Sequence, residues 1–279
     1  LVAVCDINQR LGQKIAKHND SSFIGDYKEL IGKIDAVSIA VPTELHFKIA
    51  KGLLENNIHC LVEKPITNDI TQAEQLAGIA EKQKLVLQVG HVERFNSAVR
   101  AVQAYVNKPL FIECHRMGPF KKRALDVGVV LDLMIHDIDI IMYLVQSPVT
   151  SIEAVGAKVL TDYEDIANAR LKFSNGAIAN ISASRLSAAE MRKIRIFQQD
   201  AYISLDYVKK AAVIFKKSGK HITRSNIPIK IKDALEQELA SFIECIQKNQ
   251  KPMVSGKEAT DALRIALEII NQLKTQRTQ

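Results

Sequence analysis

The sequence predicts an α/β protein with two domains: a Rossmann-type parallel sheet, then an α+β domain with a large, mainly antiparallel open sheet. Three observations lead to this prediction. Short apolar runs alternate with amphipathic stretches of helical period over the first ninety residues. Six strand-like runs then follow one another between residues 151 and 216. The 279 residues include 47% hydrophobic and 25% charged residues, a globular composition that excludes a disordered or fibrous protein.

The strands of the first half are apolar almost throughout, as expected for parallel strands that are covered on both faces. These strands are Leu1–Cys5, Ala36–Val41, His59–Val62 and Leu85–Val89. The intervening stretches predict helices at Gln9–His18, Thr43–Glu55 and Asp69–Lys82, with a helical turn at Tyr27–Gly32. Cys5 and Cys60 fall inside strands, so we expect both thiols to be buried.

The pattern changes near residue 91, so we predict domains at residues 1–91 and 92–279. The second domain begins with a helix at Phe95–Val106, a strand at Leu110–His115, a polar loop at Arg116–Arg123 and a helix near Asp126–Val145. Six strands come next, at Ser151–Leu160, Ala167–Phe173, Ala177–Ser184, Lys193–Gln198, Ala201–Tyr207 and Ala211–Lys216. Two amphipathic helices, Ala234–Gln247 and Lys257–Lys274, end the sequence.

Charge and composition narrow the function classes. Lysine and arginine number 38 against 31 acidic residues, a net charge of +7 that suits an anionic small molecule or a nucleic acid. The sequence shows no helix-turn-helix, zinc module or basic strand face with aromatic residues, so we do not expect a nucleic-acid partner. It also shows no apolar run of membrane-spanning length, so we expect no membrane and a cytoplasmic location.

The first strand ends at an acidic residue, Asp6, as the second strand of a Rossmann unit does. There the carboxylate binds the adenosine ribose, and a glycine-rich phosphate loop lies about 20 residues upstream. Five residues precede Asp6, and none of the 12 glycines has another glycine two positions away. We therefore expect an N-terminally truncated sequence. The alternative is that Asp6 only caps the helix at Gln9.

Polar residues also follow the other strands of the first domain. Glu63-Lys64-Pro65 comes at a strand end, the edge where open α/β sheets bind ligands. Lys64 could stabilise a reacting oxygen there or be a solvated surface charge. Thr43 is a candidate N-cap that could also contact a cofactor.

Two ionisable residues interrupt an otherwise apolar helix of the second domain. Asp132 and His136 are four residues apart and share a face. Such groups cost several kcal/mol to bury unless they are paired or functional, so we expect either an Asp–His ion pair or a catalytic pair. A metal site that adds Asp139 is conceivable but lacks specific ligand spacing. The preceding basic residues Arg116, Lys121, Lys122 and Arg123 form either a solvated face or a phosphate-binding loop.

Five motifs in order resemble the Gfo/Idh/MocA family of sugar and polyol dehydrogenases. They are Cys5-Asp6, Pro42-Thr43-x-x-His46, Glu63-Lys64-Pro65, Gly90-His91-x-x-Arg94-Phe95-Asn96 and Asp132-x-x-x-His136-Asp137. The segment from Arg116 to Asp132 is most similar to the branch that acts on UDP-N-acetylhexosamines and supplies lipopolysaccharide pathways.

The resemblance implies an NAD-dependent dehydrogenase in which Lys64, Asp132 and His136 form the catalytic group, with no metal. It implies that the cofactor contacts are Asp6, Pro42, Thr43, His46, Glu63, Lys64 and His91, and that the substrate contacts are Arg94, Arg116 and Arg123. The partners would be a nucleotide-sugar substrate and further copies of the chain, bound through the C-terminal sheet. Two alternatives stay open: a dehydrogenase of a free sugar or polyol such as inositol, and a non-catalytic protein that senses a sugar or cofactor.

Overall fold

The computed structural model describes residues 1–121 and 127–275, so the predicted substrate contact Arg123 lies outside the described residues. The chain divides into two compact units. The first comprises Leu1–Gly90 with Ser241–Thr260, and the second comprises His91–Ala240 with the segment from Asp261 onward. Residues 241–260 thus pack with the first unit, although the division at residue 91 assigns them to the second domain.

The parallel strands of the first unit form two sheets where the sequence suggested one. Strand β1 (Ala3–Cys5) pairs with β2 (Ser22–Ile24), a three-residue strand that is too short to show a pattern. The second sheet has the order β3 (Ala36–Ile39), β4 (His59–Glu63) and β5 (Leu87–Gly90). Its register aligns Ile39 with Val62 and Val62 with Val89, so the carboxyl ends of the three strands meet at one edge.

The helices of the first unit follow the predictions closely. They are α1 (Gln9–His18), the 3₁₀ turn η1 (Tyr27–Leu30), α2 (Thr43–Leu54) and α3 (Ile70–Gln83). Asn8 caps α1 by accepting from the Leu11 amide, so the alternative that Asp6 caps this helix is wrong. Cys60 is buried as expected, but Cys5 is exposed at the end of β1, where the short sheet leaves it uncovered.

The second unit is built on an eight-stranded sheet, and the prediction of a large, mainly antiparallel sheet is confirmed. Its order is β13-β12-β11-β10-β6-β9-β8-β7, in which β6 and β9 are parallel and the other pairs antiparallel. The strands are β6 (Phe111–Met117), β7 (Val149–Ala157), β8 (Ile166–Phe173), β9 (Ile178–Ser184), β10 (Met191–Phe197), β11 (Ala201–Asp206), β12 (Ala211–Ser218) and β13 (His221–Asn226). The sequence did not predict β13 because this edge strand is exposed throughout and Ile222 is its one apolar residue.

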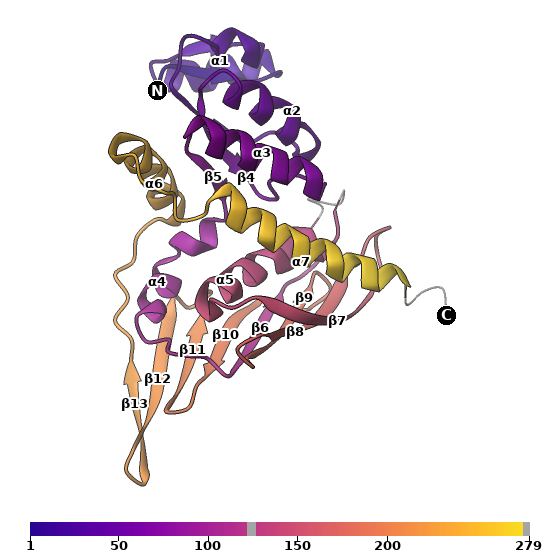
Figure 1. Cartoon of the computed structure of the whole chain (residues 1–279), viewed down its shortest axis with the longest axis vertical. Coiled ribbons are helices and arrows are strands. Elements are labelled where there is room, and N and C mark those ends of the chain that lie inside the picture. Colours follow the sequence, from indigo (N-terminus) through magenta and orange to yellow (C-terminus); the bar gives the residue numbers. More distant parts are fainter. Residues whose placement is uncertain (122–126, 276–279) are drawn as a thin grey trace. The chain divides into compact units, whose positions relative to one another are not determined.

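Helices cover one face of this sheet (Figure 1). They include α4 (Ser97–Gln103), α5 (Ile135–Val145) and the C-terminal part of α7 (Gly256–Thr275); α6 (Ala234–Lys248) precedes α7. Ile138 and Ile141 of α5 and Ile269 of α7 are fully buried in one core with alternate residues of the strands. No helix in the described ranges is long and apolar enough to cross a membrane.

Two predicted helices of this unit are interrupted. The 3₁₀ turn η2 (Val92–Phe95) precedes α4, because the Asn96 side chain accepts from the Ala98 amide and starts a new helix. The helix predicted near Asp126–Val145 starts with a π turn, η3 (Val130–Met134), before α5. A π turn contains Asp132, and such turns occur frequently at functional sites.

Candidate active site

The strand ends of the first unit gather most of the predicted cofactor contacts. Asp6 follows β1 and is partly exposed, and its Oδ1 accepts from the Asn8 amide at 2.7 Å. Glu63 ends β4 and is the register partner of Gly90 on β5. A Cβ on Gly90 would lie 2.9 Å from Glu63 Oε2, so the glycine keeps this strand edge open. Lys64 comes next in the chain and is partly exposed.

His46 joins the segments that follow two strands. Its ring is buried, with Nδ1 2.9 Å from Pro65 O and Nε2 2.8 Å from Val41 O. Both nitrogens therefore contact protein carbonyls, so His46 holds the segment beside Lys64, and its predicted direct contact with a cofactor does not fit. Thr43 is the first residue of α2, after Pro42 at the N-cap position, so the expectation that the Thr43 side chain caps this helix is wrong.

Two histidines of the second unit lie together. The rings of His91 and His136 meet edge to face, with centroids 6.2 Å apart and an interplanar angle of 82°. His91 is buried, whereas His136 on α5 is partly exposed. The structure thus places the predicted cofactor contact His91 directly against the predicted base.

Arg94 is not placed as a substrate contact. Its side chain is 2% exposed, and its Nε and Nη2 donate to Asp139 Oδ2 and Oδ1 at 2.7 and 3.3 Å. The guanidinium also lies 3.9 Å from the centroid of the Tyr143 ring. Asp139 is therefore engaged by Arg94, which removes it from the conceivable metal site. Among the residues the structure describes, no group of three or more His, Cys, Asp or Glu could hold a metal ion.

Arg116 lies in strand β6, where the sequence suggested a loop, and its charge is neutralised inside the protein. Nε and Nη2 donate to the two carboxylate oxygens of Asp137, both at 2.9 Å, and Nη1 donates to Glu93 at 2.8 Å. Burial alone would lower the pKa of Arg116, but Asp137 and Glu93 hold it well above its ordinary value. Arg116 therefore does not fit the predicted role in binding phosphates, because three of its five N–H groups are used in buried ion pairs.

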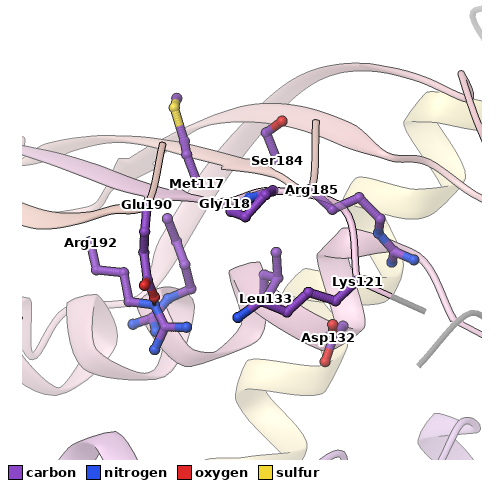
Figure 2. Close-up of a pocket in the computed structure, with 11 residues that line it drawn as sticks. Met117, Gly118, Lys121, Asp132, Leu133, Ser184, Arg185, Glu190 and Arg192 are labelled. Atoms are coloured by element: carbon purple, nitrogen blue, oxygen red, sulfur yellow. Dashed lines mark ion pairs between the residues drawn. The ribbon is translucent and has the colours of Figure 1, made fainter. Parts of the chain in front are cut away.

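Asp132 borders a pocket in the second unit that opens to solvent, with about 500 Å³ of empty space including its open mouth. The other lining residues come from the end of β6 and the segment after it, from η3, from the end of β9 and the segment after it, and from the start of β10. They are Arg116, Met117, Gly118, Pro119, Lys121, Leu133, Ser184, Arg185, Glu190 and Arg192. Figure 2 shows Glu190 and Arg192 on one side of the pocket and Lys121 with Asp132 on the other.

The pocket contains cationic side chains in two different states. Arg116 and Arg185 are buried and ion-paired. Lys121 is exposed, and the Arg192 side chain is 33% exposed beside Glu190 at 3.0 Å. The sequence did not indicate Arg192, because only the antiparallel register of β10 with β6 places it opposite Arg116. The pocket thus offers a carboxylate, Asp132, together with accessible cations for an anionic substrate.

Comparisons with known proteins match both halves of the chain. Residues 1–91 match the model of an oxidoreductase family with an NAD-binding Rossmann fold, and residues 94–204 match the GFO/IDH/MocA C-terminal domain. The chain is 33% identical to UDP-N-acetylglucosamine 3-dehydrogenase of Acidithiobacillus ferrooxidans, over 96% of this chain and 88% of that protein. It is also 25% identical to scyllo-inositol 2-dehydrogenase (NAD(+)) of Bacillus subtilis, over 86% and 76% of the two chains.

Solved structures show the same fold. A structure of the Acidithiobacillus ferrooxidans UDP-N-acetylglucosamine 3-dehydrogenase superposes with a TM-score of 0.94, covering 99% of this chain and 90% of the other. A complex of levoglucosan dehydrogenase with NADH and levoglucosan gives a TM-score of 0.89 at 18% identity, covering 99% and 88% of the two chains.

Proposed function

Because the chain belongs to the Gfo/Idh/MocA family of oxidoreductases, we propose that it oxidises a hydroxyl group of a nucleotide-activated amino sugar, as a UDP-N-acetylhexosamine 3-dehydrogenase does. The family assignment makes it an enzyme with an NAD-binding Rossmann domain. The proposal adds the substrate, which is supported by the relative at 33% identity and by the charge of the pocket beside Asp132.

The residues of the first unit fit NAD. Asp6 is a partly exposed carboxylate at a strand end, with one oxygen accepting from the Asn8 amide and a second oxygen suited to ribose hydroxyls. Gly90 keeps the neighbouring strand edge free of a side chain, and Lys64 supplies a partly exposed cation there. We propose that these residues, with Thr43, hold the cofactor. The bound NAD would supply the acceptor for the hydride that leaves the carbon bearing the substrate hydroxyl.

The side chains of the second unit supply the proton chemistry. We assign His136 as the base that takes the hydroxyl proton, since it is partly exposed and an imidazole titrates near neutral pH. His91 packs edge to face against the ring of His136, and we propose that this contact helps to orient that ring. Asp132 carries a carboxylate that orients the substrate and His136, and Lys64 stabilises the negative charge that develops on the oxygen.

One observation carries the choice of substrate: the Asp132 pocket is lined by four cationic and two anionic side chains. Arg116 and Arg185 are used in buried ion pairs, so the substrate would meet Lys121 and Arg192, whose side chain is 33% exposed and pairs with the exposed Glu190. A diphosphate matches that charge, because arginine and lysine bind phosphate oxygens by charge-assisted hydrogen bonds. The hydroxyl groups of a neutral polyol would accept only weaker hydrogen bonds from these two residues.

Absorbance at 340 nm tests the proposal directly. We expect the enzyme to form NADH with UDP-N-acetylglucosamine, and Arg192→Met and Lys121→Met to raise the KM for this substrate while kcat changes little. His136→Ala and Lys64→Ala should each lower kcat by roughly 10²–10⁴-fold. Equal kcat/KM values for inositol and UDP-N-acetylglucosamine would favour the polyol alternative. No turnover with any sugar, together with NADH binding, would favour a sensing protein.

We also propose that copies of the chain associate through the face of the large sheet opposite the helices. A row of aromatic rings crosses four strands on this face, with centroids 4.8 to 5.7 Å apart between neighbours. The rings belong to Phe111, Phe197, Tyr202 and Phe215. Light scattering after size exclusion should show an oligomer that Tyr202→Glu dissociates, whereas a monomeric wild type would contradict the proposal.

A further inference from the structure

The start of the helix that carries Asp132 is held by a residue just before β8. Glu164 is 9% exposed; its main-chain oxygen accepts from Val129 N at 2.9 Å, and its Oε1 accepts from Val130 N at 3.3 Å. Gly128 packs so closely on this carboxylate that a Cβ would lie 1.9 Å from Oε1. A carboxylate in this place also complements the positive end of the helix dipole.

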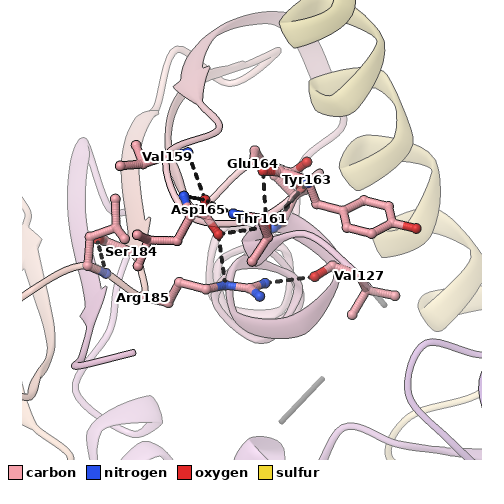
Figure 3. Close-up of polar contacts among 11 residues, drawn as sticks. Val127, Val159, Thr161, Tyr163, Glu164, Asp165, Ser184 and Arg185 are labelled. Atoms are coloured by element: carbon pink, nitrogen blue, oxygen red, sulfur yellow. Dashed lines mark hydrogen bonds and ion pairs between the residues drawn. The ribbon is translucent and has the colours of Figure 1, made fainter. Parts of the chain in front are cut away.

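Arg185 holds the same helix start from the end of β9. Its Nη2 donates to Val127 O at 2.7 Å, and its Nε lies 3.8 Å from Asp165 Oδ1. The Arg185 amide donates to Asp165 O at 3.0 Å, which fixes the two residues at the main chain as well. The Arg185 side chain is 7% exposed and that of Asp165 is 0% exposed. Figure 3 shows the guanidinium between the Asp165 carboxylate and the carbonyl of Val127.

The Asp165 carboxylate is itself immobilised by the preceding loop. Its Oδ2 accepts from the amides of Val159, Leu160 and Thr161 at 2.8, 2.7 and 2.9 Å, and its Oδ1 accepts from the Thr161 hydroxyl at 2.8 Å. Burial raises the pKa of Asp165, but these hydrogen bonds outweigh it and lower the pKa to about 2. Arg185 thus has an anionic partner with a fixed position at neutral pH.

These contacts act on the backbone that presents Asp132. Arg185 lines the pocket, but Figure 2 shows its side chain extending away from Glu190 and Arg192. Asp132 lies in the π turn that begins at Val130, directly after the main-chain groups of Val127, Val129 and Val130 that Arg185 and Glu164 hold. We propose that Arg185, anchored by Asp165, is a positioning residue that fixes the start of this helix and so aims Asp132 and His136 at the substrate. The inference rests on the proposed dehydrogenase activity.

The kinetic test uses Arg185→Ala in the enzyme, with NAD and UDP-N-acetylglucosamine. We expect kcat to fall by roughly 10–100-fold while KM changes little, since a displacement of about 1 Å can cost that much in a chemical step. The deuterium isotope effect on hydride transfer should rise. Millimolar guanidinium should restore part of kcat, because it can bridge Asp165 and the Val127 carbonyl again. If the variant only contained less folded enzyme, kcat would fall, but the isotope effect would stay at the wild-type value and guanidinium would restore no activity.

Lys172→Met is the matched control. Lys172 pairs with Glu153 at 2.9 Å on the neighbouring strands β8 and β7, with side chains 46% and 61% exposed, far from any contact with the helix start. We expect this variant to have the kcat and isotope effect of the wild type, and we expect guanidinium to leave its kcat unchanged. An Arg185→Ala variant that behaves in the same way would overturn the proposal.

Hydrogen exchange separates this proposal from the proposed function. Mass spectrometry of a peptide spanning residues 127–135 should show faster amide exchange in Arg185→Ala, whether or not turnover is detected. Faster exchange with an unchanged kcat would overturn the positioning role, and so would unchanged exchange. A wild type that oxidises no sugar would refute the proposed function, and the exchange rates would then still decide whether Arg185 holds the helix.

Discussion

The buried ion pair of Arg116 gives the sharpest prediction, because the sequence and the structure assign this residue different roles. Its side chain is 4% exposed and contacts Asp137, also 4% exposed, and Glu93, 14% exposed. If Arg116 bound substrate phosphates, Arg116→Met would raise KM and leave stability unchanged. If it neutralises Asp137, the variant leaves a buried carboxylate without its counter-charge.

The magnitude follows from that burial. Removing one partner of a buried ion pair costs about 3–5 kcal/mol of unfolding free energy. A domain of this size loses about 2–4 °C of Tm per kcal/mol, so we expect Tm to fall by about 6–20 °C. Adding Asp137→Asn to Arg116→Met should recover most of the loss, because the double variant buries no charge there. Glu93 can turn toward solvent in both variants.

Urea and thermal denaturation measure the effect, and an exposed ion pair between β10 and β6 supplies the control. Arg195 contacts Glu113 at 3.3 Å with side chains 44% and 30% exposed, so Arg195→Met should cost less than about 1 kcal/mol. Equal losses for Arg116→Met and Arg195→Met would refute the reasoning. A double variant less stable than Arg116→Met alone would refute it too.

Three further predictions follow from buried polar contacts. Hydrogen bonds lower the pKa of Asp165 in the folded protein to about 2 from an ordinary 3.8, so its carboxylate contributes about 2.5 kcal/mol to the free energy of unfolding; this contribution is complete above about pH 4 and is lost as the pH falls toward 2. Urea denaturation between pH 2 and 5 should therefore show a weaker pH dependence of stability for Asp165→Asn than for the wild type, and equal pH dependence would contradict the assignment. Gly128→Ala should lower the free energy of unfolding by about 1–3 kcal/mol, because the added methyl group overpacks on Glu164, and adding Glu164→Ala should restore most of the loss. Thermal denaturation measures both effects, and a single variant as stable as the wild type would show that the carboxylate can move aside. His46→Ala should lose about 1–3 kcal/mol because two inward-facing carbonyls lose their ring partner, and an unchanged Tm would mean that water replaces the ring.

The sequence determined the order and type of most elements, because helix and strand periods are local properties. The helices α1, α2 and α3 and the strands β8 to β12 lie where the apolar spacing predicted them. The sequence also placed polar residues at strand ends, and parallel strands share one edge for their carboxyl ends. Glu63, at the end of β4, and Gly90, at the end of β5, are accordingly register partners at the shared carboxyl edge of the sheet.

Local patterns failed where strands were very short or polar and where helices departed from regular geometry. Strand β2 has three residues, and the edge strand β13 has no apolar alternation. The π turn around Asp132 has no composition that distinguishes it from the α-helix that follows. The amide of Val130, its first residue, donates to Glu164, which is more than 30 residues away in the sequence.

Tertiary structure alone decided which charged residues can meet a substrate. The sequence cannot distinguish a solvated arginine from an ion-paired one, because the carboxylate partner lies far away in the chain. Asp139 is 45 residues from Arg94, and Asp137 is 21 residues from Arg116. Antiparallel pairing then brings Arg192 opposite Arg116 at the pocket. Burial and strand register set these pairings, and both arise from packing between elements, which periodicity within an element does not encode.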